Sequence, residues 1–455
     1  MNTSNGTVIP GLDSRSLVNR VDPTLPPIET DARTARLWAA LRDRTFRSLR
    51  HRDYRLYFYG QLVSFVGSWM QSTALMWLVY DLTGDPLWPA LLLVALVGPT
   101  LLLGPFAGAI ADHRPKRKLI TATQSAFLCT AIILTFVVGF NLATPVVLLV
   151  IQLVNGVIQA IDLPARLSFV PDLVPKADLI NAVSLGAMLF NSARFLGPAL
   201  TGVIYLLTGL IDVGVKPLTL GAAICFATNS LSFAAVLIAL SRISVGGSRT
   251  DGIGGKSSIW DGVRFLREFR ALGRLVVLTG LLCVFTWPVI TLLPAYTRTV
   301  IGLEEKAFSV FVSSLGVGAL FAALAAATFG SVHRRRRFLQ VGAVIATMGV
   351  GGLAFAANPV SAAMSCSALG FGLILFLSTG QSTLQLNAPE TARGRVMALW
   401  AMTLSASAPV GHLIAGWAAQ RWPVPAVLLI MTAGAAFSAV GIIALASGRG
   451  LKSRE

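Results

Sequence analysis

The stretch LWPALLLVALVGPTLLLGPFAGAIA at residues 87–111 contains no charged side chain, and the basic run DHRPKRK follows it directly at residues 112–118. Crossing the ~30 Å hydrocarbon core of a bilayer takes ~20 residues of helix, because every backbone polar group must be hydrogen-bonded within its own segment. The apolar stretch is long enough to cross, whereas the basic run favours water. The pair therefore predicts a transmembrane helix and a short basic loop.

Eleven further runs have the same apolar character. Together with the first they predict twelve transmembrane helices, at approximately residues 56–80, 87–111, 119–140, 142–161, 179–211, 217–241, 275–297, 307–332, 338–357, 359–389, 396–420 and 424–446. Only the fifth of these runs holds a charged residue, which is Arg194. Because 55% of the chain is hydrophobic and only 13% is charged, we expect an all-α polytopic membrane protein.

The basic residues fall on alternate connections between these runs. If residues 1–55 are cytoplasmic, all but five of the 37 Lys and Arg residues lie on the cytoplasmic side, and the exceptions are Arg194, Lys216, Arg298, Lys306 and Arg421. This bias predicts that both termini lie in the cytoplasm and that the protein spans the plasma (cell inner) membrane. The net charge of +17 is then a topology signal, so we expect no nucleic-acid partner.

The twelve runs form two groups of six. A polar, Arg-rich segment separates the groups, and His113 and His333 occupy matching loops in the two halves. We expect a cytoplasmic tail (1–52), a six-helix bundle (53–241), a central cytoplasmic loop (242–274), a second bundle (275–447) and a short cytoplasmic tail (448–455). Parallel repeats of this kind are one plan of secondary transporters, with the substrate cavity between the halves.

Enzymatic chemistry is not indicated. The chain has no HExxH motif, no cluster of metal ligands and no nucleophile with a base at a suggestive spacing. Its four cysteines stand singly in apolar runs, so we interpret them as core residues and expect neither a metal nor a cofactor. A membrane-embedded enzyme is the less favoured interpretation, and the sequence leaves a non-transporting receptor open.

Three motifs resemble signatures of the major facilitator superfamily. The run Gly108-Ala-Ile-Ala-Asp112-His-Arg-Pro-Lys-Arg117 is similar to the loop after the second helix, with His113 and Pro115 as departures, and residues 389–395 are similar to the loop after the tenth. Helix five holds Gly197-Pro198-Ala-Leu-Thr-Gly202, which resembles an exporter motif in which Thr201 replaces a glycine. The resemblance gives this list of gate and motif residues: Gly108, Asp112, Arg114, Lys116, Arg117, Arg166, Gly197, Pro198, Gly202, Glu390, Arg393 and Arg395.

Further runs are similar to the enterobactin-exporter and macrolide-efflux branch of that superfamily. They are residues 54–61, residues 67–71, Pro164-Ala-Arg166 and Asn191-Ser-Ala-Arg194. The resemblance implies two six-helix bundles that work by alternating access, as a monomer, to export a siderophore-like or drug-like small molecule against a flow of protons. A lysophospholipid or amphiphile transporter of the same fold is the alternative.

Arg194 is the most unusual single residue. A guanidinium in a membrane helix costs ~2.5 to 3.5 kcal/mol on insertion scales unless it is paired or hydrated. Two interpretations follow: a buried structural latch, bonded to polar groups of helices one and four or to Asp162, or an anchor for a substrate carboxylate or catecholate, to which Arg presents a planar fork of donors.

Polar residues also recur at helical spacing in three of the runs, where they line a cavity or bond neighbouring helices. With Arg194 and the aromatic Trp287, they give these candidate substrate contacts: Gln61, Ser64, Gln71, Gln152, Asn155, Gln159, Asn191, Gln381 and Gln385.

None of the 20 acidic residues lies in the middle of a predicted helix. The candidates for the coupling proton are therefore Asp81, Asp162 and His412, since histidine titrates near neutral pH when unperturbed. A structural role for His412, another peripheral carboxylate, a membrane potential acting on a charged substrate, and facilitated diffusion are the alternatives. Ion pairs of Asp112, of Asp162 with Arg166, and of Glu390 with its neighbouring arginines are expected at the cytoplasmic gate. Each surface pair contributes only ~0 to 1 kcal/mol, so several must act together.

Overall fold

The computed structural model describes residues 46–211, 216–244, 270–329, 335–388 and 390–447, without the side chains at 105, 107–113, 327, 329 and 390–395. All regular structure in this part of the chain is helical. It contains twelve helical segments long and apolar enough to cross a membrane, which confirms the expected fold class. Most of the predicted N-terminal tail and central loop, and the C-terminal tail, lie outside the described residues.

Six spans form the N-terminal bundle, which we define as α2 to α7. The elements are η1 (Arg47–Arg50), α2 (Arg52–Thr83), α3 (Leu87–His113), α4 (Lys116–Gly139), α5 (Pro145–Leu173), η2 (Lys176–Asp178), α6 (Leu179–Thr208) and α7 (Pro217–Ser241). Its apolar core has two parts. One surrounds the edge-on pair of Tyr57 and Phe169, and the other surrounds Tyr205 and Phe226.

The C-terminal bundle comprises α9 to α15. The elements are α9 (Arg270–Thr286), α10 (Val289–Tyr296), η3 (Thr297–Ile301), α11 (Glu305–Phe329), α12 (Arg335–Phe355), α13 (Pro359–Asn387), α14 (Glu390–Ala419) and α15 (Val424–Ser447). The uninterrupted helix expected at residues 275–297 is wrong, because a turn at Trp287 and Pro288 separates α9 from α10. Proline lacks the N–H that a continuous helix needs. The last turn of this span, η3, is π-helical.

The fourth span is longer than expected. We predicted a helix at 142–161 with Pro164 and Arg166 in the following loop, but α5 continues to Leu173 and includes both residues. Thr144 caps its first turn by accepting a hydrogen bond from the N–H of Val147. Further along, the Arg166 Nε lies 2.7 Å from the Asp162 carboxylate one turn earlier. This i,i+4 ion pair explains why the polar segment stays helical.

Consecutive spans run in opposite directions, so the molecule has two ends. We call the end where α2 begins and α15 finishes the near end, and the opposite one the far end. At the far end α2 stops at Gly84, whose φ of 64° is the left-handed conformation that glycine tolerates, and its N–H bonds the Tyr80 carbonyl. Likewise α13 starts from a capping box of Asn358 and Ser361.

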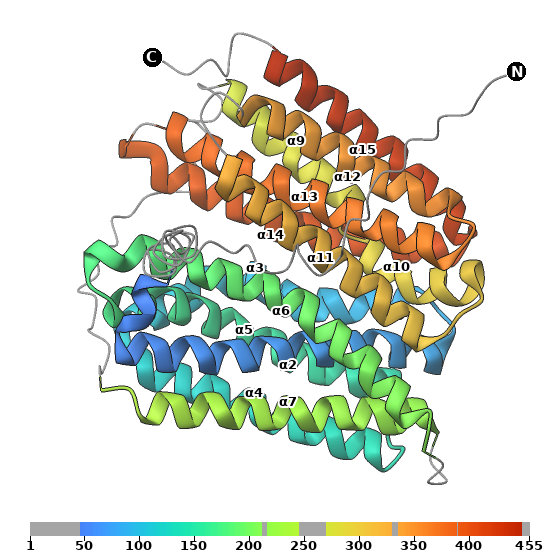
Figure 1. The fold of residues 1–455 in the computed structure, drawn as a ribbon, viewed down its shortest axis with the longest axis horizontal. Helices are drawn as coiled ribbons and strands as arrows, with labels where there is room; N and C mark the ends of the chain where they lie inside the picture. Colours follow the sequence, from blue (N-terminus) through green and yellow to red (C-terminus); the bar gives the residue numbers. More distant parts are fainter. Residues whose placement is uncertain (1–45, 212–215, 245–269, 330–334, 389, 448–455) are drawn as a thin grey trace, which may run out of the picture. The chain divides into compact units, whose positions relative to one another are not determined.

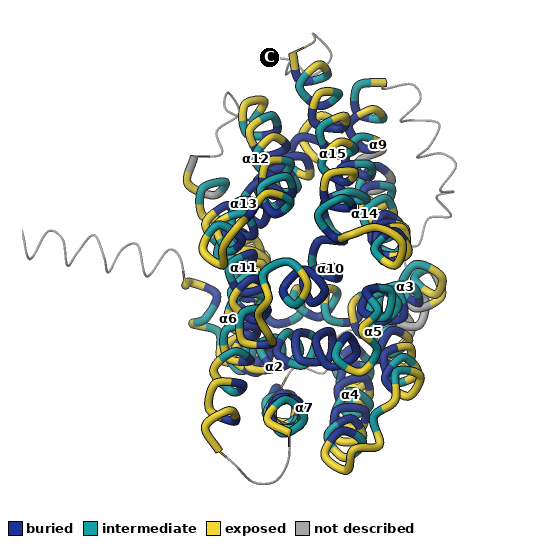
Figure 2. The backbone as a smooth tube through the Cα atoms, turned by 90° about the vertical axis from the view of Figure 1, so that its right-hand side faces the viewer, coloured by how far each residue is buried: buried dark blue, intermediate teal, exposed yellow. Residues whose placement is uncertain are grey.

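The two bundles lie side by side, blue to green against yellow to red (Figure 1). Across the boundary α6 packs against α11 and α3 against α14. Figure 2, which looks along the helices, shows α2 between α7 on one side and α10 on the other. The face of α2 that carries Gly60 and Gly67 contacts α7, so its opposite face is directed toward the C-terminal bundle.

Three of the four cysteines are in the core, as predicted: Cys225, Cys283 and Cys366 are buried. Cys129 is exposed, so its assignment to the core is wrong. It lies one helical turn before Ile133, which is 50% exposed, and both belong to the outer apolar face of α4. A small apolar residue suits a lipid-facing position as well as a core position.

Candidate functional site

Arg194 lies midway along α6, and no polar side chain among the described residues is paired with it. Its Nε is buried without a hydrogen-bond acceptor, and no carboxylate among the described residues forms an ion pair with it. Asp162, which we considered as its partner, pairs with Arg166 instead. The Arg194 guanidinium carbon lies 5.5 Å from the ring centroid of Trp69 on α2, within cation–π range. A latch through Asp162 is therefore wrong, and the cation is held against an aromatic face.

Three aromatic rings connect Arg194 with Arg166. The Phe190 ring meets Trp69 at 6.0 Å and Phe65 at 5.7 Å between centroids, both edge-on. The Arg166 guanidinium lies 4.8 Å from the Phe65 centroid. We call Phe65, Trp69 and Phe190 the aromatic row. The row was not among our predictions, although its i,i+4 spacing, Phe65 to Trp69 and Phe190 to Arg194, was visible in the sequence.

The row is directed away from α7. Residues 60 and 67 are about two helical turns apart and face α7, and Phe65 and Trp69 project from another side of α2. Phe190 is 43% exposed, and Phe65, Trp69 and Arg194 are partly exposed. An aromatic face with an unpaired guanidinium, accessible on the side of α2 toward the other bundle, is suited to holding a flat anion.

The two bundles touch at the level of Arg194. A Cβ on Gly316 of α11 would lie 2.7 Å from the Arg194 carbonyl oxygen, and the Ser313 hydroxyl donates to the Phe195 carbonyl over 3.3 Å. Toward the far end, a Cβ on Gly202 would lie 3.2 Å from the Ser309 Cβ. We call this α6–α11 contact the seam. Small residues along it allow the two backbones to approach closely.

Other contacts close the far end. Gln420 donates to Asp85 over 2.7 Å, Arg298 binds Asp81 over 2.5 Å, and the rings of Trp77 and Phe308 lie 5.5 Å apart. Among the described residues, the side-chain hydrogen bonds, ion pairs and ring contacts that join the bundles all lie between Arg194 and the far end. Arg194 thus lies at the inner limit of the closed region.

The polar stripe of α5 binds within its own bundle. Asn155 accepts from Thr130 over 2.6 Å and donates to Gln152 over 3.1 Å, while Asp162 accepts from Thr123 over 2.6 Å. Thr123 and Thr130 belong to α4. Gln152, Asn155 and Asp162 are all buried. The stripe therefore joins α5 to α4, and the cavity interpretation does not describe these three residues.

The remaining polar candidates divide into bound and accessible groups. Gln61 accepts from Arg166 over 3.0 Å, Gln71 accepts from Asn229 of α7 over 2.8 Å, and Ser64 is buried. The accessible group consists of Gln159, Asn191, Gln381 and Gln385, which are partly or fully exposed. Trp287 sits at the break between α9 and α10 and packs against the core of the C-terminal bundle.

Each coupling candidate has a defined partner. Asp81 binds Arg298, and Asp162 binds Arg166. His412 is buried, and its Nδ1 lies 3.2 Å from the Thr291 hydroxyl. Because that hydroxyl donates to the Pro288 carbonyl over 2.8 Å, it accepts from Nδ1–H.

The described gate residues bind within the N-terminal bundle. Lys116 Nζ contacts Asp172 over 3.0 Å, and Arg117 donates to the Ser241 carbonyl over 2.9 Å. Arg114 is exposed. Gly197 packs on α2, where a Cβ would lie 2.5 Å from the Trp69 Cβ, and Pro198 is buried within the continuous α6. The remaining side chains, those of Gly108, Asp112, Glu390, Arg393 and Arg395, lie outside the described part.

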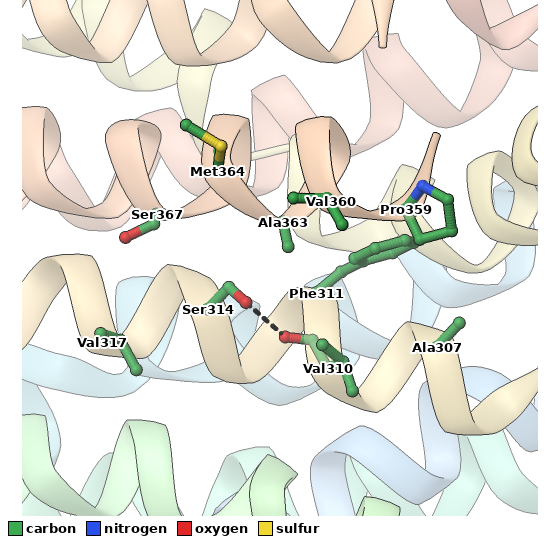
Figure 3. A pocket seen from close by; sticks show the side chains of 10 residues that line it. All are labelled: Ala307, Val310, Phe311, Ser314, Val317, Pro359, Val360, Ala363, Met364 and Ser367. Carbon is green, nitrogen blue, oxygen red and sulfur yellow. Dashed lines mark hydrogen bonds between the residues drawn. The ribbon is translucent and has the colours of Figure 1, made fainter. Parts of the chain in front are cut away.

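A pocket of about 460 Å³ lies between α11 and α13 (Figure 3). Its walls are apolar apart from Ser314 and Ser367, and the Ser314 hydroxyl donates to the Val310 carbonyl. Val360 and Met364 in its wall are 69% and 68% exposed, so the pocket opens on the outer face of the bundle. It offers no charge to a polar ligand, but it suits a hydrocarbon chain.

The chain is similar in sequence to known transporters. Residues 43–449 match the family model described as transmembrane secretion effector. The staphyloferrin A transporter of Staphylococcus aureus is 28% identical over 59% of this chain and 66% of its own length. Macrolide efflux protein A of Streptococcus pyogenes is 23% identical over 82% of this chain and 91% of its own.

Solved structures show the same fold. A bacterial homologue of the iron transporter ferroportin, 19% identical, matches over 87% of this chain and 99% of its own in the inward-facing state, with a TM-score of 0.65. In the outward-facing state the match covers 87% of this chain and 100% of the homologue, with a TM-score of 0.56. The chain is a multi-pass membrane protein of the major facilitator superfamily, and it belongs to the transmembrane secretion effector family of transporters.

Proposed function

We propose that this protein is a secondary active exporter of a small organic anion, with Arg194 as the anchor for the anionic group. The observation that carries the proposal is the Arg194 guanidinium, whose Nε is buried without a hydrogen-bond acceptor among the described residues and which lies against Trp69. An unpaired guanidinium in a membrane helix is expensive to maintain. A bound carboxylate or catecholate repays that free energy with charge-assisted hydrogen bonds.

The aromatic row suits a flat organic substrate. A ring of the substrate stacks against Trp69 or Phe190, while its anionic group bonds Arg194. The names of the relatives, a staphyloferrin A transporter and a macrolide efflux protein, support a siderophore-like or drug-like molecule. We therefore expect aromatic carboxylates or catecholates to compete for the site and uncharged analogues of the same size to fail.

We take the direction, export, from the efflux relatives. The positive-inside bias places the near end in the cytoplasm, and we propose that the protein works as a monomer in the plasma membrane. The contacts that join the bundles beyond Arg194 then lie on the outer side of the membrane. Protons are the proposed coupling ion, carried by Asp81, Asp162 or His412. Proton flux in liposomes tests this: we expect neutralisation of at least one of the three to uncouple substrate flux from a pH gradient, and parent-like coupling in all three variants contradicts it.

The test of the anchor is transport by the Arg194→Ala variant. Loss of a charge-assisted hydrogen bond of ~1.5 to 3 kcal/mol lowers affinity by about ten- to hundredfold, so we expect export into inside-out vesicles to be nearly abolished while the protein folds. Arg194→Lys keeps the charge without the planar fork, and Trp69→Phe keeps an aromatic face, so both are expected to retain partial activity. Parent-like transport by Arg194→Ala contradicts the proposal.

Movement of a lysophospholipid or another amphiphile is the second candidate function, and the apolar pocket between α11 and α13 favours it. A single acyl chain fits such a surface, and it enters from the lipid side. The two functions give different results in one assay. Replacing Met364 with Trp fills the pocket, which blocks amphiphile transport but leaves export of a water-soluble anion unchanged.

A further inference from the structure

We propose that Trp77, Tyr80 and Asp81 form a cation-binding cage on α2, which holds the guanidinium of Arg298 from the other bundle when the far end is closed. The cage is a specific site with a replaceable occupant, so a free guanidinium compound binds it when Arg298 is absent. The inference concerns the balance between the closed and open far end, and it depends neither on the substrate nor on the coupling ion.

The three cage residues surround one guanidinium. The Arg298 Nη2 lies 2.5 Å from the Asp81 carboxylate, and its guanidinium carbon lies 5.1 Å from the Trp77 centroid and 5.7 Å from the Tyr80 centroid. A carboxylate flanked by two electron-rich rings is the arrangement that recognises organic cations. The contact joins residues 217 positions apart in the chain and belonging to different bundles.

The cage belongs to a single rigid element. Trp77, Tyr80 and Asp81 occupy one side of α2 at spacings of three and four residues, within a continuous helix. Trp77 is fully buried and Tyr80 nearly so, and the Trp77 ring lies tilted against Phe308 of the C-terminal bundle, 5.5 Å between centroids. Because α2 carries all three groups, the cage persists when the bundles separate, and separation uncovers it toward the far end.

Arg298 lies on a short segment that is set apart from the rest of its bundle. Arg298 lies in η3, beyond the turn at Trp287 and Pro288 that interrupts the seventh span. π-Helical turns are uncommon and occur often at functional sites. The segment of α10 and η3 ends at Gly302, whose φ is 72°. A short segment with a break at one end and a left-handed residue at the other is suited to withdrawing Arg298 from α2 without unfolding either bundle.

Neighbouring charges do not replace Arg298 in the cage. Asp85 is bonded to Gln420, and Glu304, Glu305 and Lys306 form no ion pair among the described residues. Lys306 points instead to α6, where its Nζ would lie 2.9 Å from a Cβ on Gly209. The side chains of Asp81 and Arg298 are 32% and 36% exposed, so water and small solutes reach the pair from the far end.

The first experiment measures the open population at the far end. Spin labels at Leu210 of the N-terminal bundle and Val360 of the C-terminal bundle, both highly exposed, report the distance between bundles by pulsed electron resonance. Exposed Cys129 is first replaced by serine. Arg298→Ala is expected to raise the ratio of open to closed molecules by about tenfold, because an ion pair and two cation–π contacts are lost. An unchanged ratio overturns the proposal.

The second experiment refills the cage. Millimolar methylguanidinium added to Arg298→Ala is expected to occupy the cage and to fail to restore closure, because it is not attached to the C-terminal bundle. Its binding is read from quenching or shift of Trp77 fluorescence. The same titration on Arg298→Ala/Asp81→Asn serves as the matched control and is expected to show at least a tenfold weaker response. Equal responses in the two proteins overturn the cage.

The charge-swapped protein Asp81→Arg/Arg298→Asp tests whether the effect of Arg298→Ala comes from the lost ion pair or from poor folding. It restores an ion pair between the bundles but places the cation on α2 itself. We expect the closed population to recover in part relative to Arg298→Ala, and no recovery contradicts an electrostatic latch. Because these readouts need no substrate, they stay informative even if Arg194 anchors no anion.

Discussion

At the scale of single residues, two arginines in the N-terminal bundle differ in their partners. Arg166 is surrounded by Asp162, Gln61 and the face of Phe65, whereas among the described residues Arg194 has the face of Trp69 and no ion pair. A structural arginine in a membrane protein is normally paired. The difference supports the proposed roles, in which Arg166 stabilises the bundle and Arg194 binds a ligand.

We predict that Asp162→Ala lowers the stability of the protein. Asp162 is fully buried and bonds Arg166, Thr123 and Gln124, so its removal leaves Arg166 without a counter-ion. Breaking a buried pair in this way costs ~3 to 5 kcal/mol. Thermal unfolding in detergent measures the effect, and the double variant Asp162→Ala/Arg166→Ala is expected to recover part of the loss. An unfolding midpoint equal to that of the parent would show that the pair is not structural.

At the scale of elements, the seam between α6 and α11 is the contact that must break for the far end to open. Gly316 stands at its inner limit, where a Cβ would lie 2.7 Å from backbone atoms of Arg194 and Phe195. Backbone atoms yield less readily than side chains, so any larger residue at this position forces the helices apart. Because Arg194 belongs to the seam, a movement of its backbone also changes the contact that closes the far end.

Gly316→Ala is therefore expected to reduce the closed population of the far end by about tenfold. The distance between labels at Leu210 and Val360 reports the change. Gly186→Ala is the matched control, because Gly186 lies in α6 and a Cβ added there would have no atom within 4 Å. If both variants keep the distance distribution of the parent, the seam does not set the closed state.

The sequence was sufficient to predict the elements but not their partners. Twelve apolar runs and the basic loops between them were visible, because the bilayer imposes a length and a polarity on each span. The polar stripe of α5 was also visible, yet periodicity cannot show whether a stripe meets α4 or a cavity. Pro288 indicated a break in the seventh span, but the apolar run on both sides of it led us to predict one continuous helix.

Contacts between distant residues were beyond the sequence. Nothing in the local pattern links Asp81 to Arg298, and Phe65, Trp69 and Phe190 lie within apolar runs where aromatic residues are ordinary. Arg194 was identified correctly as unusual, because a charge in such a run stands out. Its lack of a partner emerged only when Asp162 was found bound to Arg166.

At the scale of the whole molecule, the side-chain hydrogen bonds, ion pairs and ring contacts that join the bundles among the described residues lie between Arg194 and the far end. Packed interfaces change between discrete states. Two bundles that touch at one end are therefore suited to separate there and to touch at the other end. In the mechanism that we propose, the contact region moves from one side of Arg194 to the other during transport.

The most direct test measures both ends of the molecule in the same membrane. Labels at Leu210 and Val360 report the far end, and labels at Ile180 and Leu386, both exposed, report the near end. As substrate or a pH gradient is applied, we predict that the far-end distance lengthens while the near-end distance shortens in the same fraction of molecules. Distances that stay constant, or that lengthen together at both ends, would contradict alternating access around Arg194.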